Sequence, residues 1–542
     1  MTDTDQQNER EQFFGAAKVV AATTILSRVL GLVRDIAINS LGAYRTTSAF
    51  RLAFQIPNLF RRLFGEGALS AAFVPVFSES LEDSDDRARA LLGNALALLT
   101  AFLSALLVLV AMGLTCWALL TDRSDHQLLS TLTLIMLPFT LTVCTLALVS
   151  AALNCRGHFF FPAFAPVLLN IAIILAAWGV APAISDEVVP RLYVIAAAVP
   201  IAGVIQLIGA LSMLRRMGLR CRLRLRPVLG GSRRVVRLAG PMLIGLGFLQ
   251  LSELLYSALA YALAATDTHP TLQLGPWSIA KPLQEGALVR IDAARRLYQF
   301  PMGVLAISLG VAVFPLLSRY ASRGDMPNLR SSFNRALRLA LMEGLAAGAG
   351  LFLLAEPITR LLFEHGRFTA ADAASSAHVL RFYAVGVWAI CTYQISARGF
   401  YALQDTITPL KVACGVMLVG LAAVLGTMWI PAIAAGAFGV GTVVSAALNT
   451  VLLVWLLRRR LGRLGGRQLA LSATRSLVAT AVMAGVLLAV RHALAGQSPG
   501  VIVAAAVPAG AVAFLLAARL LGMPELGELL QGALKREDKP TE

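Results

Sequence analysis

Charged residues are scarce in this sequence. Aspartate, glutamate, lysine and arginine make up 14% of the 542 residues, against about 25% in an ordinary soluble domain, and 57% of the residues are hydrophobic. Apolar runs long enough to cross a bilayer recur from one end of the chain to the other, and the run from Ala90 to Leu120 contains no charge at all. This pattern excludes a soluble enzyme held by a single anchor.

Motifs for covalent, metal or nucleotide chemistry are also missing. The six cysteines form no C-x-x-C pair and show no metal-ligand spacing, so the sequence predicts packing residues and no metal site. The six histidines are scattered and there is no P-loop, so we expect no cofactor, no enzymatic activity and no ATP-driven step in this chain. Met1 to Gln12 lacks a basic region and a cleavage site, so we expect the first span to be retained.

The apolar runs are continuous and do not alternate. Open sheets cannot lie in hydrocarbon, and a barrel needs alternating strands of about ten residues. The predicted fold class is therefore an all-α polytopic membrane protein. We expect about fourteen spans, near 16–37, 46–77, 90–119, 128–153, 161–183, 192–214, 236–264, 291–318, 332–362, 376–403, 407–427, 432–457, 471–490 and 499–521.

Three proline-containing segments recur at a nearly constant spacing of 244, 240 and 243 positions, which indicates an internal repeat: Phe54–Pro57 with Tyr298–Pro301, Pro75–Ser78 with Pro315–Ser318, and Pro166 with Pro409. Transporters are often built from such repeats, with the substrate site between the halves. The alternative is chance, because prolines are common in membrane helices. A repeat predicts two pseudo-symmetric six-helix lobes around a central cavity, followed by two C-terminal helices.

The net charge of +17 comes largely from arginines in three stretches between spans, at 215–237, 319–338 and 458–467. Positive residues at span ends stay in the cytoplasm, so these stretches and both termini are expected inside, and no nucleic-acid motif accompanies them. The predicted segments are a cytoplasmic tail at 1–15, an N-terminal lobe at 16–214, a basic cytoplasmic linker at 215–235, a C-terminal lobe at 236–457 with an irregular extracytoplasmic loop at 265–290, a basic cytoplasmic loop at 458–470, two further spans at 471–521 and a cytoplasmic tail at 522–542.

Several charges fall inside predicted spans, where each costs at least about 2.5–3.5 kcal/mol. Helical spacing places Arg28 and Asp35 on one face, and predicts an ion pair between Arg62 and Glu66 that leaves Arg61 without a partner on its own helix. Arginine exceeds acid overall, and guanidinium groups suit bidentate binding of phosphate. The alternatives are pairing with acids on other helices and snorkelling to an interface. The charges are Arg28, Arg34, Asp35, Arg51, Arg61, Arg62, Glu66, Glu253, Arg295 and Arg296.

Two long motifs resemble those of the MurJ (MviN) lipid II flippases. The segment Ser27–Asp35 resembles the first-helix signature of that family, and Pro57–Ala68 resembles the second-helix signature. Shorter matches follow in the same order along nearly the whole chain, at Phe73–Pro75, Pro162–Pro166, Gly303–Leu305, Leu362–Thr369 and Asp405–Pro409.

The resemblance implies fourteen helices in two lobes, with a lipid-tail groove formed by the last two. It implies a bacterial inner-membrane flippase that moves undecaprenyl-diphosphate-linked peptidoglycan precursor (lipid II) outward by alternating access. Its partners would be lipid II or a similar polyprenyl-diphosphate glycolipid, membrane lipids, a monovalent ion and cell-wall synthesis proteins. The headgroup ligands would be Arg28, Arg34, Arg61 and Arg296, and the supporting or gating residues Asp35, Arg62, Glu66, Glu253 and Arg295.

Three positions depart from the family pattern. Ser48 stands where the family commonly has an aspartate, Arg295 replaces an acid, and Gln299 replaces a glutamate. The cavity would thus have fewer acids and one more base than the family pattern. This difference could change which ion is coupled to transport and which headgroup is bound. We expect Glu253 to act as a compensating partner for Arg295.

Other functions remain open at this point. An exporter of a different polyprenyl-linked glycan would need the same arginines, whereas an exporter of cationic drugs should show unpaired acids. A membrane scaffold for cell-wall enzymes would tolerate loss of Arg28 or Arg61. A membrane-embedded transferase would need a cluster of acids, a metal site or a nucleophile motif, which the sequence does not show.

Overall fold

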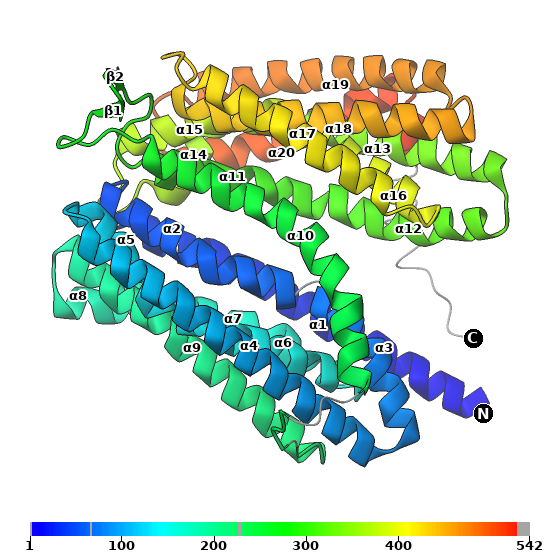
Figure 1. Ribbon diagram of the computed structural model, residues 1–542. Helices are drawn as coiled ribbons and strands as arrows, with labels where there is room; N and C mark the ends of the chain where they lie inside the picture. Colours follow the sequence, from blue (N-terminus) through cyan, green and yellow to red (C-terminus); the bar gives the residue numbers. More distant parts are fainter. Residues whose placement is uncertain (1–2, 66–67, 221, 226–229, 528–542) are drawn as a thin grey trace. The chain divides into compact units, whose positions relative to one another are not determined.

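The computed structural model describes residues 3–65, 68–220, 222–225 and 230–527, and the chain is almost entirely helical there (Figure 1). This confirms the predicted all-α class. Contacts divide the chain into two compact units, Met1–Ala262 (unit 1) and Leu263–Glu542 (unit 2). The first unit therefore extends through the helix at 230–262, which the sequence pattern had assigned to the C-terminal lobe.

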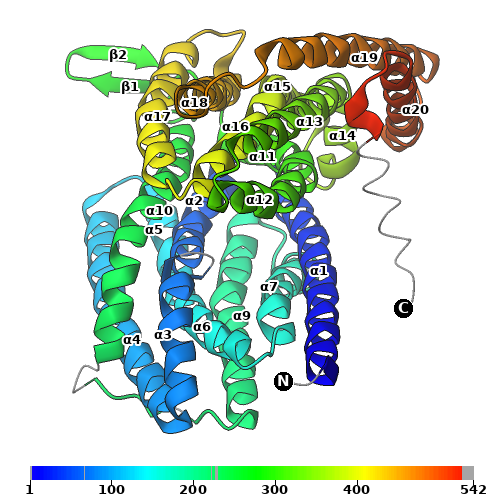
Figure 2. The same cartoon turned by 90° about the vertical axis from the view of Figure 1, so that its right-hand side faces the viewer.

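Unit 1 contains α1 (Asp3–Asn39), α2 (Arg45–Phe60), the π-helical turn η1 (Arg61–Gly65), α3 (Ala68–Asp83), α4 (Asp85–Leu120), α5 (Ser124–Met136), α6 (Pro138–Cys155), α7 (Phe160–Leu175), η2 (Ala176–Val180), α8 (Ala181–Ile184), α9 (Val188–Arg216) and α10 (Gly230–Ala262). Helix α1 is longer than its predicted span, since it already begins at Asp3. It lies beside α7, and α6 lies beside α9 (Figure 2).

Unit 2 contains β1 (Thr271–Leu274), β2 (Trp277–Ala280), α11 (Ala287–Val304), α12 (Ala306–Ser322), α13 (Met326–Leu353), α14 (Ala355–Phe363), α15 (Ala370–Val385), α16 (Val387–Ala402), α17 (Ile407–Thr427), η3 (Ala434–Gly436), α18 (Ala437–Leu461), α19 (Gly466–Ala493) and α20 (Pro499–Leu520). Helix α17 pairs with α18, and α19 pairs with α20. The prediction of an irregular loop at 265–290 is wrong in part, because residues 271–280 form an antiparallel hairpin.

Within the described residues, nine helices or helix series are long and apolar enough to cross a membrane, and a bent pair, α11 with α12, raises this to ten. The chain is thus a membrane protein. Each of the fourteen predicted segments coincides with a helix or a run of consecutive helices, while the count of fourteen spans stays a prediction. Helices α1, α2 and α10, which carry several of the candidate charges, are not among the nine.

Helix ends follow local capping chemistry. The side chain of Ser84 accepts a hydrogen bond from the backbone of Arg87 at the start of α4, where Asp85 and Asp86 also favour the positive end of the helix dipole. Thr369 and Asp372 form a reciprocal capping box at the start of α15. These capping residues mark where each of the two helices begins.

The repeated prolines lie at corresponding interruptions. In unit 1, the π-helical turn η1 begins at Arg61, and the carbonyl of Pro57 accepts a hydrogen bond from the Arg61 backbone. In unit 2, the helix is broken at Leu305, whose backbone donates to the carbonyl of Pro301. Each interruption thus falls four residues after a member of the Phe54–Pro57 and Tyr298–Pro301 pair, which favours a true repeat over chance.

The segment after α20 packs into a hydrophobic cluster with α13 and α19. Met523 and Leu526 are buried in that cluster, and between them Glu525 is only 1% exposed. Its carboxylate pairs with the guanidinium of Arg338 on α13 at 2.7 Å. One buried ion pair therefore holds the start of the C-terminal tail against unit 2.

We predict that Glu525→Gln lowers the free energy of unfolding by about 3 kcal/mol or more, because it leaves the mostly buried Arg338 guanidinium without a counter-charge. The measurement is thermal unfolding of the purified chain in detergent. The matched control is Glu79→Gln, which breaks an exposed pair with Arg234 worth about 0–1 kcal/mol. An equal effect of the two substitutions would contradict the prediction.

Candidate functional site

The carboxylate of Asp35 is the centre of the charge cluster in unit 1. Arg34 Nη2 lies 2.9 Å and Arg51 Nη1 lies 3.3 Å from the same oxygen, Asp35 Oδ1. The Asp35 side chain is 3% exposed, and both arginines are largely buried. Two guanidinium groups therefore share one buried carboxylate, and these three side chains together carry more positive than negative charge.

Neutral amides complete this cluster. Arg34 Nη1 donates to Asn170 Oδ1 at 3.1 Å, and the buried amide of Asn170 donates in turn to the carbonyl of Ser27 on α1. The Arg34 guanidinium also lies over the ring of Phe54, 5.6 Å from its centroid. Asn170 of helix α7 thus fixes the direction of the Arg34 guanidinium.

Arg51 has a structural role in this cluster. Besides Asp35, its guanidinium donates to Asn39 Oδ1 at 2.5 Å, so it joins α2 to the end of α1. This matches the alternative in which single arginines pair with acids on other helices. Arg28, on the same helix as Asp35, is exposed, and no described residue forms an ion pair or hydrogen bond with its side chain.

The π-helical turn η1 presents the next two arginines. Arg61 Nε donates to Asn58 Oδ1 at 2.9 Å, so the expectation that it lacks a partner on its own helix is wrong. Arg62 Nη1 lies 3.1 Å from both Gln250 Oε1 and Glu253 Oε2 on α10. Arg62 was predicted to pair with Glu66, which lies outside the described residues, and in the structure it pairs with Glu253.

Unit 2 places its two candidate arginines on α11. Arg295 is buried, and its Nη1 lies 3.4 Å from Asp292 Oδ1, one turn earlier on the same helix. Arg296 is half-buried. Just before this pair on α11, Arg290 forms an ion pair with Asp372 of α15 at 2.9 Å. This ion pair fixes α11, which carries Arg295 and Arg296, to α15.

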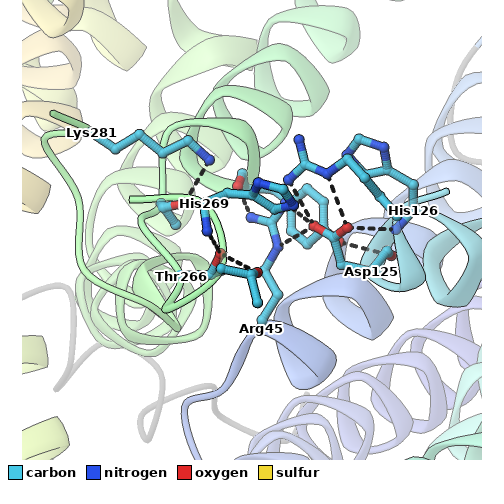
Figure 3. Close-up of polar contacts among 10 residues, drawn as sticks. Arg45, Asp125, His126, Thr266, His269 and Lys281 are labelled. Carbon is cyan, nitrogen blue, oxygen red and sulfur yellow. Dashed lines mark hydrogen bonds and ion pairs between the residues drawn. The ribbon is translucent and has the colours of Figure 1, made fainter. Parts of the chain in front are cut away.

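A further polar network in unit 1 was not predicted from the sequence (Figure 3). Arg45, at the start of α2, donates from Nη2 to Asp125 Oδ2 at 2.9 Å, and its guanidinium lies 3.5 Å from the centroid of the Tyr261 ring. The Tyr261 hydroxyl donates to the carbonyl of Asp125 at 3.1 Å. The starts of α2 and α5 and the end of α10 are therefore joined, which orients α10 and its Glu253.

The residues missed by the sequence analysis are mostly neutral amides. Four amide side chains accept hydrogen bonds from candidate arginines: Asn39, Asn58, Asn170 and Gln250. An amide carries no charge, so it does not stand out in an apolar run as an arginine does. The sequence feature that could have identified them is a polar amide within an apolar helix, because a buried amide needs a hydrogen-bond partner.

Interrupted, proline-bearing helices that carry cationic side chains, in a chain with many membrane-crossing helices, are typical of membrane transporters. The family model for the lipid II flippase MurJ matches residues 38–506 of this chain. The chain belongs to the MurJ family of lipid II flippases.

Curated relatives agree with this assignment. A lipid II flippase MurJ of Burkholderia cenocepacia is 33% identical over 459 residues, which cover 82% of this chain and 84% of the relative. A probable lipid II flippase MurJ of Bdellovibrio bacteriovorus is 33% identical over 473 residues, covering 84% and 83%. The resemblance noted from the two N-terminal motifs, and the transport function that it implied, are thereby confirmed.

Solved structures agree in fold. A lipid II flippase MurJ in an inward closed conformation is similar with a TM-score of 0.74 at 20% identity, covering 92% of this chain and 98% of that one. An inward-facing MATE multidrug transporter of the MOP superfamily is similar with a TM-score of 0.65 at 14% identity, covering 83% and 98%. The helical architecture is thus the one these transporters share.

We predict that Asp35→Asn lowers transport at least about tenfold and also lowers the thermal midpoint, because two largely buried guanidinium groups would lose their shared counter-charge. Asp83→Asn is the matched control, since it makes the same change in the exposed Asp83–Arg87 pair. Both variants are compared by transport at equal expression and by thermal unfolding. Normal transport by Asp35→Asn would show that the shared carboxylate is dispensable.

Proposed function

We propose that this member of the lipid II flippase family binds the diphosphate and sugar headgroup of lipid II through Arg28, Arg34, Arg61 and Arg296, and moves it from the inner to the outer leaflet by alternating access. The observation that carries the proposal is the pair of guanidinium groups on the single buried carboxylate of Asp35. Their excess positive charge suits an anionic ligand, and guanidinium groups bind phosphate in a bidentate manner.

The four arginines have different surroundings, which supports different roles. Arg34 is held by Asp35 and Asn170, so it suits a fixed contact to the substrate. Arg28 is exposed and suits capture of the headgroup. Arg61 lies on the π-helical turn η1, and its Nε donates to Asn58 Oδ1, so its position follows the bend of the helix.

Supporting roles follow from the same contacts. Asp35 orients Arg34, and Glu253 orients Arg62 on η1. Glu66 is carried over as a gating residue from the family motif. Arg295, with Asp292 close to it, would adjust the charge around Arg296.

The setting of the transport is a bacterial inner membrane, with both termini and the three arginine-rich stretches in the cytoplasm. The two lobes, the central cavity and the lipid-tail groove of the last two helices are carried over from the family. A monovalent ion or the membrane potential would drive the switch between states, and cell-wall synthesis proteins would supply and use the precursor.

A different polyprenyl-linked glycan is the second candidate substrate. It is favoured by Ser48, Arg295 and Gln299, which together remove acids and add a base relative to the family pattern. The diphosphate contact would be the same for both substrates, so the arginines do not distinguish them, and the test must use lipid II itself.

The test is lipid II translocation in cells whose own flippase can be switched off, read out as cleavage of lipid II by a membrane-impermeant hydrolase added outside. We expect the chain to restore cleavage, and Arg28→Ala or Arg61→Ala to reduce it at least about tenfold at equal expression, because each removes a phosphate-binding group. Arg87→Ala, an exposed arginine on α4, is the control and should transport normally.

Two outcomes would count against the proposal. Absence of cleavage with a well-expressed wild-type chain would favour the second substrate or a scaffold. Full activity of both arginine variants would show that flipping does not depend on these headgroup contacts.

A further inference from the structure

The hairpin β1–β2 of unit 2 has one apolar and one polar face. Successive side chains of a strand point to opposite faces, and the register pairs Leu272 with Ile279 and Gln273 with Ser278. Leu272, Ile279 and Trp277 therefore share one face. On the other face Gln273 Nε2 donates to Ser278 Oγ at 3.2 Å, so the polar face is bonded across the strands.

Most of the apolar face is left uncovered by the described part of the chain, and only Leu272 is half-buried. Trp277 is 72% exposed and Ile279 is 38% exposed. An isolated two-stranded hairpin is at best marginally stable in water, and three apolar side chains on one small face add to that cost. The hairpin thus needs an apolar surface against which this face can pack.

The base of the hairpin fixes its position in unit 2. The Leu283 backbone donates to the carbonyl of Leu263 at 3.3 Å, and Lys281 Nζ donates to the carbonyl of Ala264 at 3.2 Å. Figure 3 shows Lys281 and, in the same loop, the turn closed between Thr266 and His269. Strands of four residues reach only about 13 Å from this base, so the hairpin stays close to the helix end at which α11 begins.

That end of unit 2 carries a marker of the membrane interface. The turn from α17 to α18 lies at the same end as the hairpin in both views (Figures 1 and 2), and it exposes Trp429 and Ile430 directly after the membrane-crossing helix α17. Tryptophan is enriched at the boundary between hydrocarbon and water. The opposite end of α18 carries Arg458, Arg459 and Arg460, which assigns the hairpin end to the outer leaflet.

We propose that the hairpin is a membrane anchor: it lies in the outer-leaflet interface, with Trp277 and Ile279 against the lipid acyl chains and Ser278 toward water. The bilayer is the apolar surface within reach of the hairpin base. The anchor holds the start of α11, where Arg290 is paired with Asp372, and so sets the depth of the helix that carries Arg295 and Arg296. The proposal depends on the chain's being a membrane protein and does not depend on its substrate.

The experiment measures lipid contact of the indole in the full chain in nanodiscs. The emission of Trp277 is obtained by subtracting the spectrum of W277F from that of the wild type. Phospholipids brominated near the headgroup end of the acyl chains quench indoles in the interface, and acrylamide quenches indoles in water. The matched control is W277F/S278W minus W277F, which reports an indole on the opposite face of the same strand.

We expect brominated lipid to reduce the Trp277 emission at least about twofold and acrylamide to have little effect, with the opposite result for the indole placed by S278W. Equal thermal midpoints of the variants show that the fold is intact. Quenching of Trp277 by acrylamide alone would place the face in water, and quenching by neither agent would place it against protein. Either result would overturn the anchor.

Discussion

A charge buried in the apolar interior of a protein needs a counter-charge, and in unit 1 Asp35 supplies one for two arginines. One buried carboxylate lies between Arg34 and Arg51, which connects α1 with α2. Because one acid serves two bases, these three side chains together carry more positive than negative charge. The same ion pairs connect two helices and, in the function we propose, would contribute to the site for an anionic headgroup.

The other charged clusters connect helices in the same way. Arg62 joins η1 to Glu253 of α10, Arg290 joins α11 to α15, and Arg338 holds the segment after α20. Each pair links an element that carries a candidate ligand, or the C-terminal helices, to a neighbour. A transporter must move such helices together as rigid units. Ion pairs can join helices in a membrane where apolar contacts cannot, because lipid tails offer apolar side chains equally good contacts.

Apolar run length predicted the helical fold well, since each predicted segment coincides with a helix or a run of consecutive helices. The hairpin at 271–280 was missed because Gly275 and Pro276 suggest a loop, and strands of four residues give too short an alternation to detect. The candidate arginines were found because charge is conspicuous in an apolar run. Their partners were not, because Arg62 pairs across 191 positions with Glu253 and not with a residue on its own helix.

The central claim is that the arginines of unit 1 hold the anionic headgroup, and its most direct measurement is lipid II binding to the purified chain by native mass spectrometry. Titrations would compare the wild type with Arg28→Ala, Arg61→Ala and the exposed control Arg87→Ala. We expect the dissociation constant to rise about tenfold or more for each of the first two variants, as about 1.4 kcal/mol or more is lost, and to be unchanged for the control. Equal affinities in all four proteins would contradict the account.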